Sequence, residues 1–142
     1  MKKRILKVCI IIFLIVGVIS ILLFNSKDYV DVVKNTLDNA KIIKLYDYKT
    51  KDYILEYNKD ETEELIKNLE YGKWQESNKL NGDEKLYLLK IYKDEDSEDI
   101  GTITVYKSMN YVEVKVKDSE EIKIFKTNKN LKKVINTQKK DN

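Results

Sequence analysis

The sequence predicts an α+β fold: an N-terminal transmembrane helix followed by one small domain with an antiparallel sheet and helices packed on one face. Three observations lead to this prediction. The first 24 residues are basic and then apolar, and the remainder alternates between short strand-like runs and helix-like runs. Most of the strand-like runs follow one another directly, which favours antiparallel pairing and separates the strands from the helices.

The N-terminal stretch has the pattern of a membrane anchor. An uncharged run from Val8 to Phe24 follows four basic residues, Lys2, Lys3, Arg4 and Lys7. A helix rises about 1.5 Å per residue, so residues 5–24 would cover roughly 30 Å, the thickness of the hydrocarbon core of a bilayer. Because basic residues mark the cytoplasmic side, we expect a single-pass protein of the cell membrane, with the N-terminus cytoplasmic and residues 25–142 extracytoplasmic.

The same stretch could instead be a cleaved signal peptide. Val18 and Ser20 are small enough to precede a cleavage site, but the apolar run continues through residues 21–24 beyond it. An apolar segment that extends past the cut is more typical of an uncleaved anchor. We therefore predict an anchor over residues 1–24 that contacts the membrane through residues 5–24, and keep a secreted form as the alternative.

The composition of the remaining chain limits its chemistry. Four of the 27 basic residues lie in the first stretch, which leaves 23 lysines against 24 acidic residues. This neutral balance, and the lack of any arginine after Arg4, argue against nucleic acid as a partner. The chain has no histidine, and its one cysteine, Cys9, lies in the predicted anchor. Ser-His-Asp and Cys-His catalysis and the usual zinc sites are thereby excluded, so we expect neither an enzyme nor a bound cofactor.

The first elements after the anchor follow from the spacing of apolar residues. Residues 28–40 form a helical stripe that would act as a juxtamembrane spacer over residues 25–40. Residues 42–48 and 53–57 are β-branched and aromatic on both sides of a polar turn, which predicts a hairpin. Asp60, with Glu63 three residues later, predicts the start of a helix, and Gly72 is well placed to end it.

The second half of the domain, which we place over residues 41–137, reads as a strand meander. Residues 74–80 are ambiguous and lead to a turn at Asn81-Gly82. Strands are predicted over 86–92, 100–106, 111–117 and 122–126, and in the third of these three valines alternate with Glu113, Lys115 and Lys117, the pattern of a strand with one solvated face. Thr127 or Asn128 can begin a final helix, and the tail over 138–142 should fray.

Acidic residues suggest two further activities, both weakly. The run 94–99 alternates carboxylates as a calcium loop does, but Asp99 and Val105 occupy the positions where an EF-hand requires Gly and Glu. A hairpin tip with solvated charges is the simpler interpretation. An envelope hydrolase that uses two carboxylates stays open as an alternative function, because sequence alone cannot place two acids in one cleft.

Tyrosine is unusually frequent, with ten residues, and most of them lie in or beside predicted strands. Such rings commonly cover the edge of a core while the hydroxyl reaches water. They could also form an aromatic surface for an envelope protein or a glycan. The candidate binding residues on this second interpretation are Tyr71, Trp74, Tyr87, Tyr92, Tyr106 and Tyr111.

Four features of the chain together carry a resemblance: the basic-then-apolar start, the helix Asp-Glu-Thr-Glu-Glu-Leu-Ile-Lys-Asn-Leu over 60–69, Trp74, and the strand over 111–114. With these features the chain resembles small uncharacterised single-anchor envelope proteins of low-G+C Gram-positive bacteria, which are domains of unknown function. The resemblance implies the location and the α+β domain, and it implies no catalytic residues. We therefore expect a membrane-anchored, extracytoplasmic, non-enzymatic binding or regulatory module. The alternative from another class is a secreted inhibitor or immunity-type protein released by signal cleavage.

Overall fold

The computed structural model describes the backbone of residues 2–78 and 82–137, and within it the side chains of residues 4–20, 31–78 and 82–135. It separates into two compact units, Met1–Val32 and Val33–Asn142. The elements in chain order are α1 (Lys2–Asp38), β1 (Ile42–Asp47), β2 (Tyr53–Tyr57), α2 (Lys59–Leu69), η1 (Tyr71–Lys73), β3 (Gln75–Ser77), β4 (Lys85–Tyr92), β5 (Asp99–Tyr106), β6 (Tyr111–Val116), β7 (Ile122–Lys126) and α3 (Leu131–Thr137).

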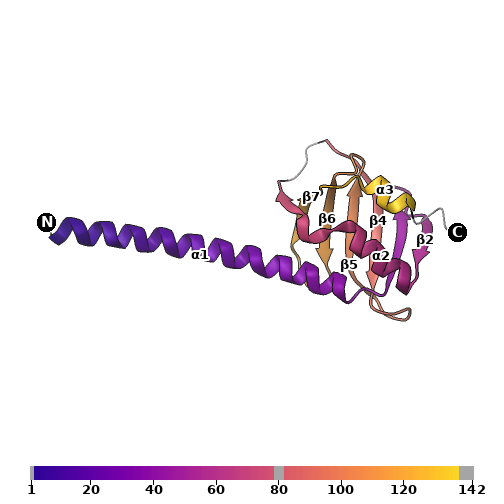
Figure 1. Ribbon diagram of the computed structural model, residues 1–142, viewed down its shortest axis with the longest axis horizontal. Helices are drawn as coiled ribbons and strands as arrows, with labels where there is room; N and C mark the ends of the chain where they lie inside the picture. Colours follow the sequence, from indigo (N-terminus) through magenta and orange to yellow (C-terminus); the bar gives the residue numbers. More distant parts are fainter. Residues whose placement is uncertain (1, 79–81, 138–142) are drawn as a thin grey trace. The chain divides into compact units, whose positions relative to one another are not determined.

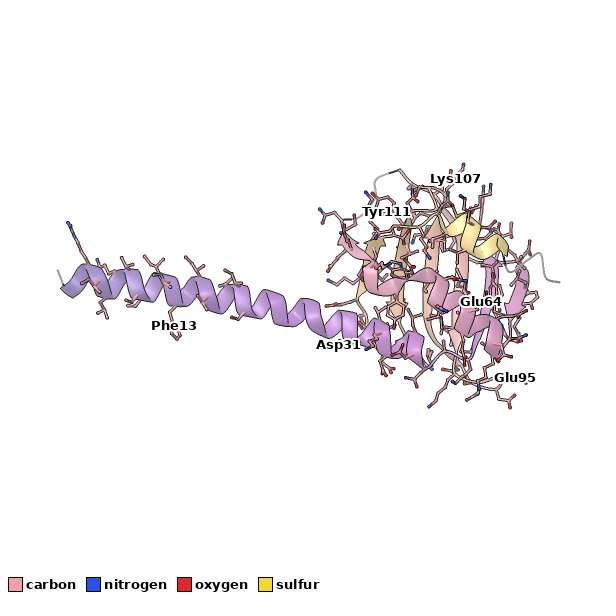
Figure 2. All side chains as sticks on the ribbon, in the orientation of Figure 1. Phe13, Asp31, Glu64, Glu95, Lys107 and Tyr111 are labelled. Carbon is pink, nitrogen blue, oxygen red and sulfur yellow. The ribbon has the colours of Figure 1, made fainter. Side chains whose placement is uncertain are left out.

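The first unit consists of the N-terminal part of α1 and corrects our prediction of a membrane anchor. Its described side chains are all exposed, and Phe13, 85% exposed, projects from the helix (Figure 2). Among the residues that the structure describes, no helix has both the length and the apolar character needed to cross a membrane. The side chains of residues 21–24 of the predicted anchor lie outside those that the structure describes.

Two further predictions depended on that anchor and are corrected with it. The transmembrane part of the predicted fold class is wrong, and the predicted single-pass location in the cell membrane loses the helix on which it was based. The helix predicted over 28–40 is present as the C-terminal part of α1, which runs without interruption to Asp38. The predicted frayed tail, 138–142, lies outside the described residues.

The second unit contains a seven-stranded sheet in the order β2-β1-β4-β5-β6-β7-β3 (Figure 1). Every neighbouring pair of strands is antiparallel. The predicted hairpin and the predicted meander are both confirmed, and the pairing of β1 with β4 joins them into one sheet. The short strand β3 closes the far edge by pairing with β7, and the predicted turn residue Asn81 lies outside the described residues.

One face of this sheet carries the hydrophobic core. Residues directly opposite each other in paired strands share a face, and the register places a nearly continuous apolar layer on one side, made of Ile43, Leu45, Leu89, Ile91, Ile103, Val105, Val112, Val114 and Phe125. All of these side chains are buried. Helix α2 contacts β1, β2 and α3, and both helices lie in front of the strands in Figure 1. We call this side the helix-covered face.

The opposite side, which we call the helix-free face, is covered by no helix of the described residues 33–78 and 82–137. Its residues alternate with the core residues along each strand, and most are polar or aromatic and half-buried or exposed: Lys44, Tyr46, Tyr53, Glu56, Leu88, Lys90, Tyr92, Thr102, Glu113 and Lys115. The alternation predicted for the strand over 111–117 is therefore confirmed, with its valines in the core and Glu113 and Lys115 on the solvated side. The α+β character of the domain is confirmed as well.

Gly101 positions the last turns of α1 on the helix-covered face. A Cβ atom at this position would lie 3.0 Å from the carbonyl oxygen of Lys115 and 3.1 Å from Cγ2 of Thr36. The missing side chain therefore lets the helix approach strand β5, and Val33 and Leu37 on the same turns are buried. The sequence pattern gave no sign of this role, because only the tertiary contact requires a glycine there.

The boundaries of α2 differ from the prediction at both ends. Its N-cap is Asn58, whose Oδ1 accepts a hydrogen bond from the backbone N–H of Glu61 at 3.0 Å while Glu61 Oε2 accepts from the backbone N–H of Asn58 at 2.8 Å. This reciprocal pair begins the helix two residues before the predicted cap, Asp60. The helix ends at Leu69, before the predicted stop at Gly72, because Glu70 adopts a left-handed conformation with φ 46°. Lys73 and Lys129, 3.1 Å and 3.0 Å from its carboxylate, pair with Glu70 there.

Candidate binding surface

The helix-free face carries a cluster of three tyrosines, which we call the tyrosine cluster: Tyr46, Tyr53 and Tyr92 on β1, β2 and β4. The rings of Tyr46 and Tyr53 meet edge to face, with centroids 5.9 Å apart. Tyr53 is 57% exposed, and the other two are half-buried. Burial, together with the neighbouring Tyr46, raises the pKa of Tyr92 to about 12, so all contacts of this hydroxyl are made in its neutral form near pH 7.

A line of cross-strand pairs places three lysines across the same face, and we call Lys44, Lys90 and Lys115 the lysine row. Lys44 lies opposite Lys90, Lys90 opposite Thr102, and Thr102 opposite Lys115. Glu56 lies opposite Lys44 at the β2 edge, with 3.5 Å between the Lys44 ammonium and its carboxylate. In the part of the chain that the structure describes, no carboxylate lies within ion-pair distance of Lys90 or Lys115.

The direct opposition of Lys44 and Lys90 is unfavourable in itself. Like charges opposite each other on neighbouring strands destabilise a sheet. The rings of the tyrosine cluster relieve part of this repulsion, since the ammonium of Lys44 lies 5.0 Å from the ring centroid of Tyr92 and that of Lys90 lies 5.2 Å from the centroid of Tyr46. Lys44, Lys90 and the tyrosine cluster therefore form one interacting surface.

A groove of about 460 Å³ opens on the same face towards the β3 edge. Its floor contains Glu113, whose side chain is only 15% exposed and accepts hydrogen bonds from the Lys85 ammonium at 3.1 Å and from the Tyr106 hydroxyl at 3.0 Å. The remaining wall is formed by Ser77, Asn78, Ile122, Lys123 and Ile124. The polar groups at the floor satisfy one another, and we call this site the polar groove.

In the described part of the chain, the pKa values that differ from their ordinary values all lie farther from pH 7: those of carboxyl groups are lowered, and those of lysines and tyrosines are raised. A hydrogen bond from the backbone of Thr50 lowers the pKa of Asp47. Hydrogen bonds from the side chains of Lys129 and Lys117 lower the pKa of Glu70 and of Glu98, in that order. Burial opposes the charge on Lys85, but the bond to Glu113 outweighs it and raises its pKa. Burial and Glu113 raise the pKa of Tyr106 to about 12. General acid-base catalysis requires the opposite arrangement, a pKa moved towards that of the medium.

The structure divides the six predicted binding residues between the two faces. Tyr92, Tyr106 and Tyr111 lie on the helix-free face; Tyr111, labelled in Figure 2, pairs with Lys126 at the start of β6. Tyr87 lies on the core side of β4, opposite Val105. Tyr71 donates a hydrogen bond to Asp38 at 2.9 Å, and Trp74 donates one to the carbonyl of Leu69 at 3.0 Å while its ring packs against Phe125.

Sequence reasoning missed the residues that give the surface its charge. The alternation predicts a solvated face for Lys115, but no sequence pattern distinguishes Lys44 or Lys90, and Tyr46 and Tyr53 are only two of the tyrosines in predicted strands. Alternation along a strand indicates which residues share a face, whereas the row depends on the register between strands that are up to 46 positions apart in sequence, as Lys44 and Lys90 are. Only the folded sheet aligns them.

The acidic stretch 94–99 is an exposed hairpin tip between β4 and β5. Ser97 Oγ donates a hydrogen bond to the Asp94 carbonyl at 3.1 Å, and Glu98 forms an ion pair with Lys117. Within the described residues, no group of three or more potential ligands is placed to hold a metal ion.

No protein-family model, no curated protein and no solved structure matches this chain.

Proposed function

We propose that residues 33–137 form a non-catalytic protein-binding module, which holds its partner on the helix-free face of the sheet. The observation that carries the proposal is the tyrosine cluster beside the lysine row on a sheet face that no helix of this unit covers. Tyrosines that combine apolar area with a polar tip are enriched where proteins bind one another. Their two side-chain torsions cost little conformational entropy when a partner immobilises them.

Two features support binding over catalysis. The polar groove has a size at which small molecules bind, but the Lys85, Tyr106 and Glu113 groups at its floor are bonded to one another. The shifted pKa values leave Lys85 charged and Tyr106 neutral near pH 7. Neither group is therefore poised to exchange a proton with a substrate.

A peptide-display selection tests the proposal. Random peptides are selected on the immobilised full-length chain, and the enriched clones are then measured against two single variants. Lys90→Gln alters the helix-free face, whereas Lys67→Gln removes the same charge from the exposed surface of α2. We expect most enriched clones to bind the Lys67→Gln protein as they bind the wild type and to lose affinity for Lys90→Gln.

Two results would contradict the proposal. Enriched clones that bind both variants equally would place the binding surface elsewhere. Turnover of a peptide or glycan substrate by the purified chain, abolished by Glu113→Gln, would show that the groove is catalytic.

A further inference from the structure

We propose that the lysine row binds an acidic peptide segment of a partner protein, held in an extended conformation across strands β1, β4, β5 and β6. This inference rests on the proposed function and specifies the chemistry of the partner. It follows from three properties of the row: its excess of positive charge, its length, and the position of its ammonium groups over the tyrosine rings.

The charge of the helix-free face differs from that of the domain as a whole. The chain after residue 7 has nearly equal numbers of lysines and acidic residues, yet the row presents three ammonium groups and shares one carboxylate, Glu56. Of the other carboxylates that the structure describes near this face, Glu113 is already bonded to Lys85 and Tyr106, and Asp99 lies opposite Tyr92 without an ion pair to the row. A ligand with several carboxylates would therefore supply the charge that this face lacks.

The length of the row matches an extended chain. Neighbouring strands lie about 4.8 Å apart, so the three strand spacings from Lys44 to Lys115 cover roughly 14 Å. In an extended peptide, every second side chain points the same way at intervals of about 7 Å, so three alternate acidic residues also span roughly 14 Å. Flexible lysine stems can adjust to the remaining mismatch. Thr102 lies between Lys90 and Lys115 in the strand register, and its hydroxyl could bond the peptide backbone.

The same surface is poorly suited to nucleic acid. Single strands bind proteins by stacking bases on open aromatic rings, but ammonium groups lie over Tyr46 and Tyr92, at 5.2 Å and 5.0 Å from the ring centroids. Tyr53 presents its ring edge to face against Tyr46. The ring of Tyr53 is still partly exposed. A peptide can place an apolar side chain against this ring while its carboxylates contact the lysine row.

Fluorescence anisotropy on the full-length chain tests the inference. The probe is a peptide of alternating Glu and Ser carrying an uncharged fluorophore. The test variant is Lys90→Gln/Lys115→Gln, and the matched control is Lys67→Gln/Lys132→Gln, which removes two exposed lysines from α2 and α3. We expect the test variant to bind the probe about tenfold more weakly than the wild type, and the control to bind within about twofold. Added salt should weaken the wild-type complex.

Several results would overturn the inference. A probe that does not bind, or that binds the test variant and the control equally, would show that the row does not recognise carboxylates. An oligothymidylate of equal charge that binds more tightly than the probe, with the same dependence on Lys90 and Lys115, would identify nucleic acid as the ligand. Display clones that depend on Lys90 but carry no excess of Asp and Glu would overturn this inference while leaving the proposed function in place. Clones that do not depend on Lys90 would contradict both.

Discussion

At the scale of single residues, Tyr57 stands out because its hydroxyl lies in the core without a partner. The side chain is 1% exposed, and among the described residues its Oη is the buried side-chain polar atom that makes no hydrogen bond. A buried polar group that is not hydrogen-bonded costs free energy on folding. The ring itself fills the core next to α2, so its apolar part stabilises the domain while its hydroxyl does the opposite.

We predict that Tyr57→Phe stabilises the protein. The substitution keeps the ring and removes the unpaired hydroxyl, so the free energy of unfolding should rise by about 1 kcal/mol. Urea denaturation followed by circular dichroism measures the change. Tyr106→Phe is the matched comparison, since it removes a hydroxyl bonded to Glu113, and it should lower the free energy of unfolding by about 1 kcal/mol. A loss of stability on Tyr57→Phe would show that the hydroxyl has a partner, such as an internal water.

The same residue predicts how the protein responds to alkali. Burial, and secondarily Glu61, raise the pKa of Tyr57 from the ordinary 10.0 to about 12. In the unfolded chain this tyrosine ionises near pH 10, whereas the folded protein holds the proton to higher pH. The stability that the folded protein gains from this difference in the pKa of Tyr57 is therefore fully present below pH 10, and it is lost as the pH rises through about 12.

Urea midpoints measured at several pH values between 9 and about 12 test this sign. We expect the wild-type midpoint to fall with rising pH, and the Tyr57→Phe protein to lose less stability over the same interval. Identical pH dependence of the two proteins would contradict the account of Tyr57.

At the scale of elements, the contact of α1 with β5 depends on Gly101. We predict that Gly101→Ala destabilises the protein by about 1–3 kcal/mol, because the new methyl group would press on the backbone carbonyl of Lys115 and on Thr36. The Thr36→Ser substitution removes Cγ2 and should restore part of the loss. Gly72→Ala is the control, since its Cβ would meet no atom within 4 Å. Equal effects at the two glycines, measured by thermal unfolding, would show that Gly101 makes no special contact.

The start of α2 gives a second prediction at this scale. Asn58→Ala removes one half of the capping pair with Glu61 and should lower the free energy of unfolding by about 1 kcal/mol. Asp60→Ala, at the cap that the sequence pattern indicates, should cost less because Asp60 contributes only through the helix dipole. Chemical denaturation of both variants decides between the caps, and the reverse order of effects would place the helix start at Asp60.

Helix α2 and the strands other than β3 could be predicted from sequence to within a few residues, because each depends on local periodicity. Valines alternating with Glu113 and Lys115 fixed the face of β6, and the hairpin of β1 and β2 followed from its flanking polar turn. The cap was misplaced because Asn58-x-x-Glu61 and Asp60-x-x-Glu63 are equally good patterns, and only the completed hydrogen bonds distinguish them. The left-handed Glu70 was missed because that conformation is uncommon for a residue with a side chain.

At the scale of the whole molecule, sequence reasoning could give neither the order of the strands nor the proposed binding surface. The pairing of β1 with β4 and of β3 with β7 joins segments far apart in the chain, and neither pairing leaves a local pattern. The lysine row exists only through this register. The predicted anchor shows the converse error, since an apolar run was interpreted from its composition alone, and the described residues contain no helix that could span a membrane.

On the proposed function, binding and stability oppose each other on this surface. Lys44 and Lys90 lie directly opposite each other, an arrangement that weakens the sheet, and Lys90 and Lys115 have no carboxylate within ion-pair distance among the described residues. A sheet selected for stability alone would pair these charges. Residues that serve binding at some cost in stability are expected where proteins meet their partners.

One measurement tests this central claim most directly: the unfolding free energy and the affinity for the alternating Glu-Ser peptide, both determined on the same Lys90→Gln/Lys115→Gln protein. Relief of the like-charge pair and loss of the contact with Tyr46 have opposite signs, so we predict an unfolding free energy within about 1 kcal/mol of the wild type. We predict at the same time an affinity about tenfold weaker. An unchanged affinity, or a loss of binding explained by a fall of several kcal/mol in the free energy of unfolding, would contradict the assignment of this face as the binding surface.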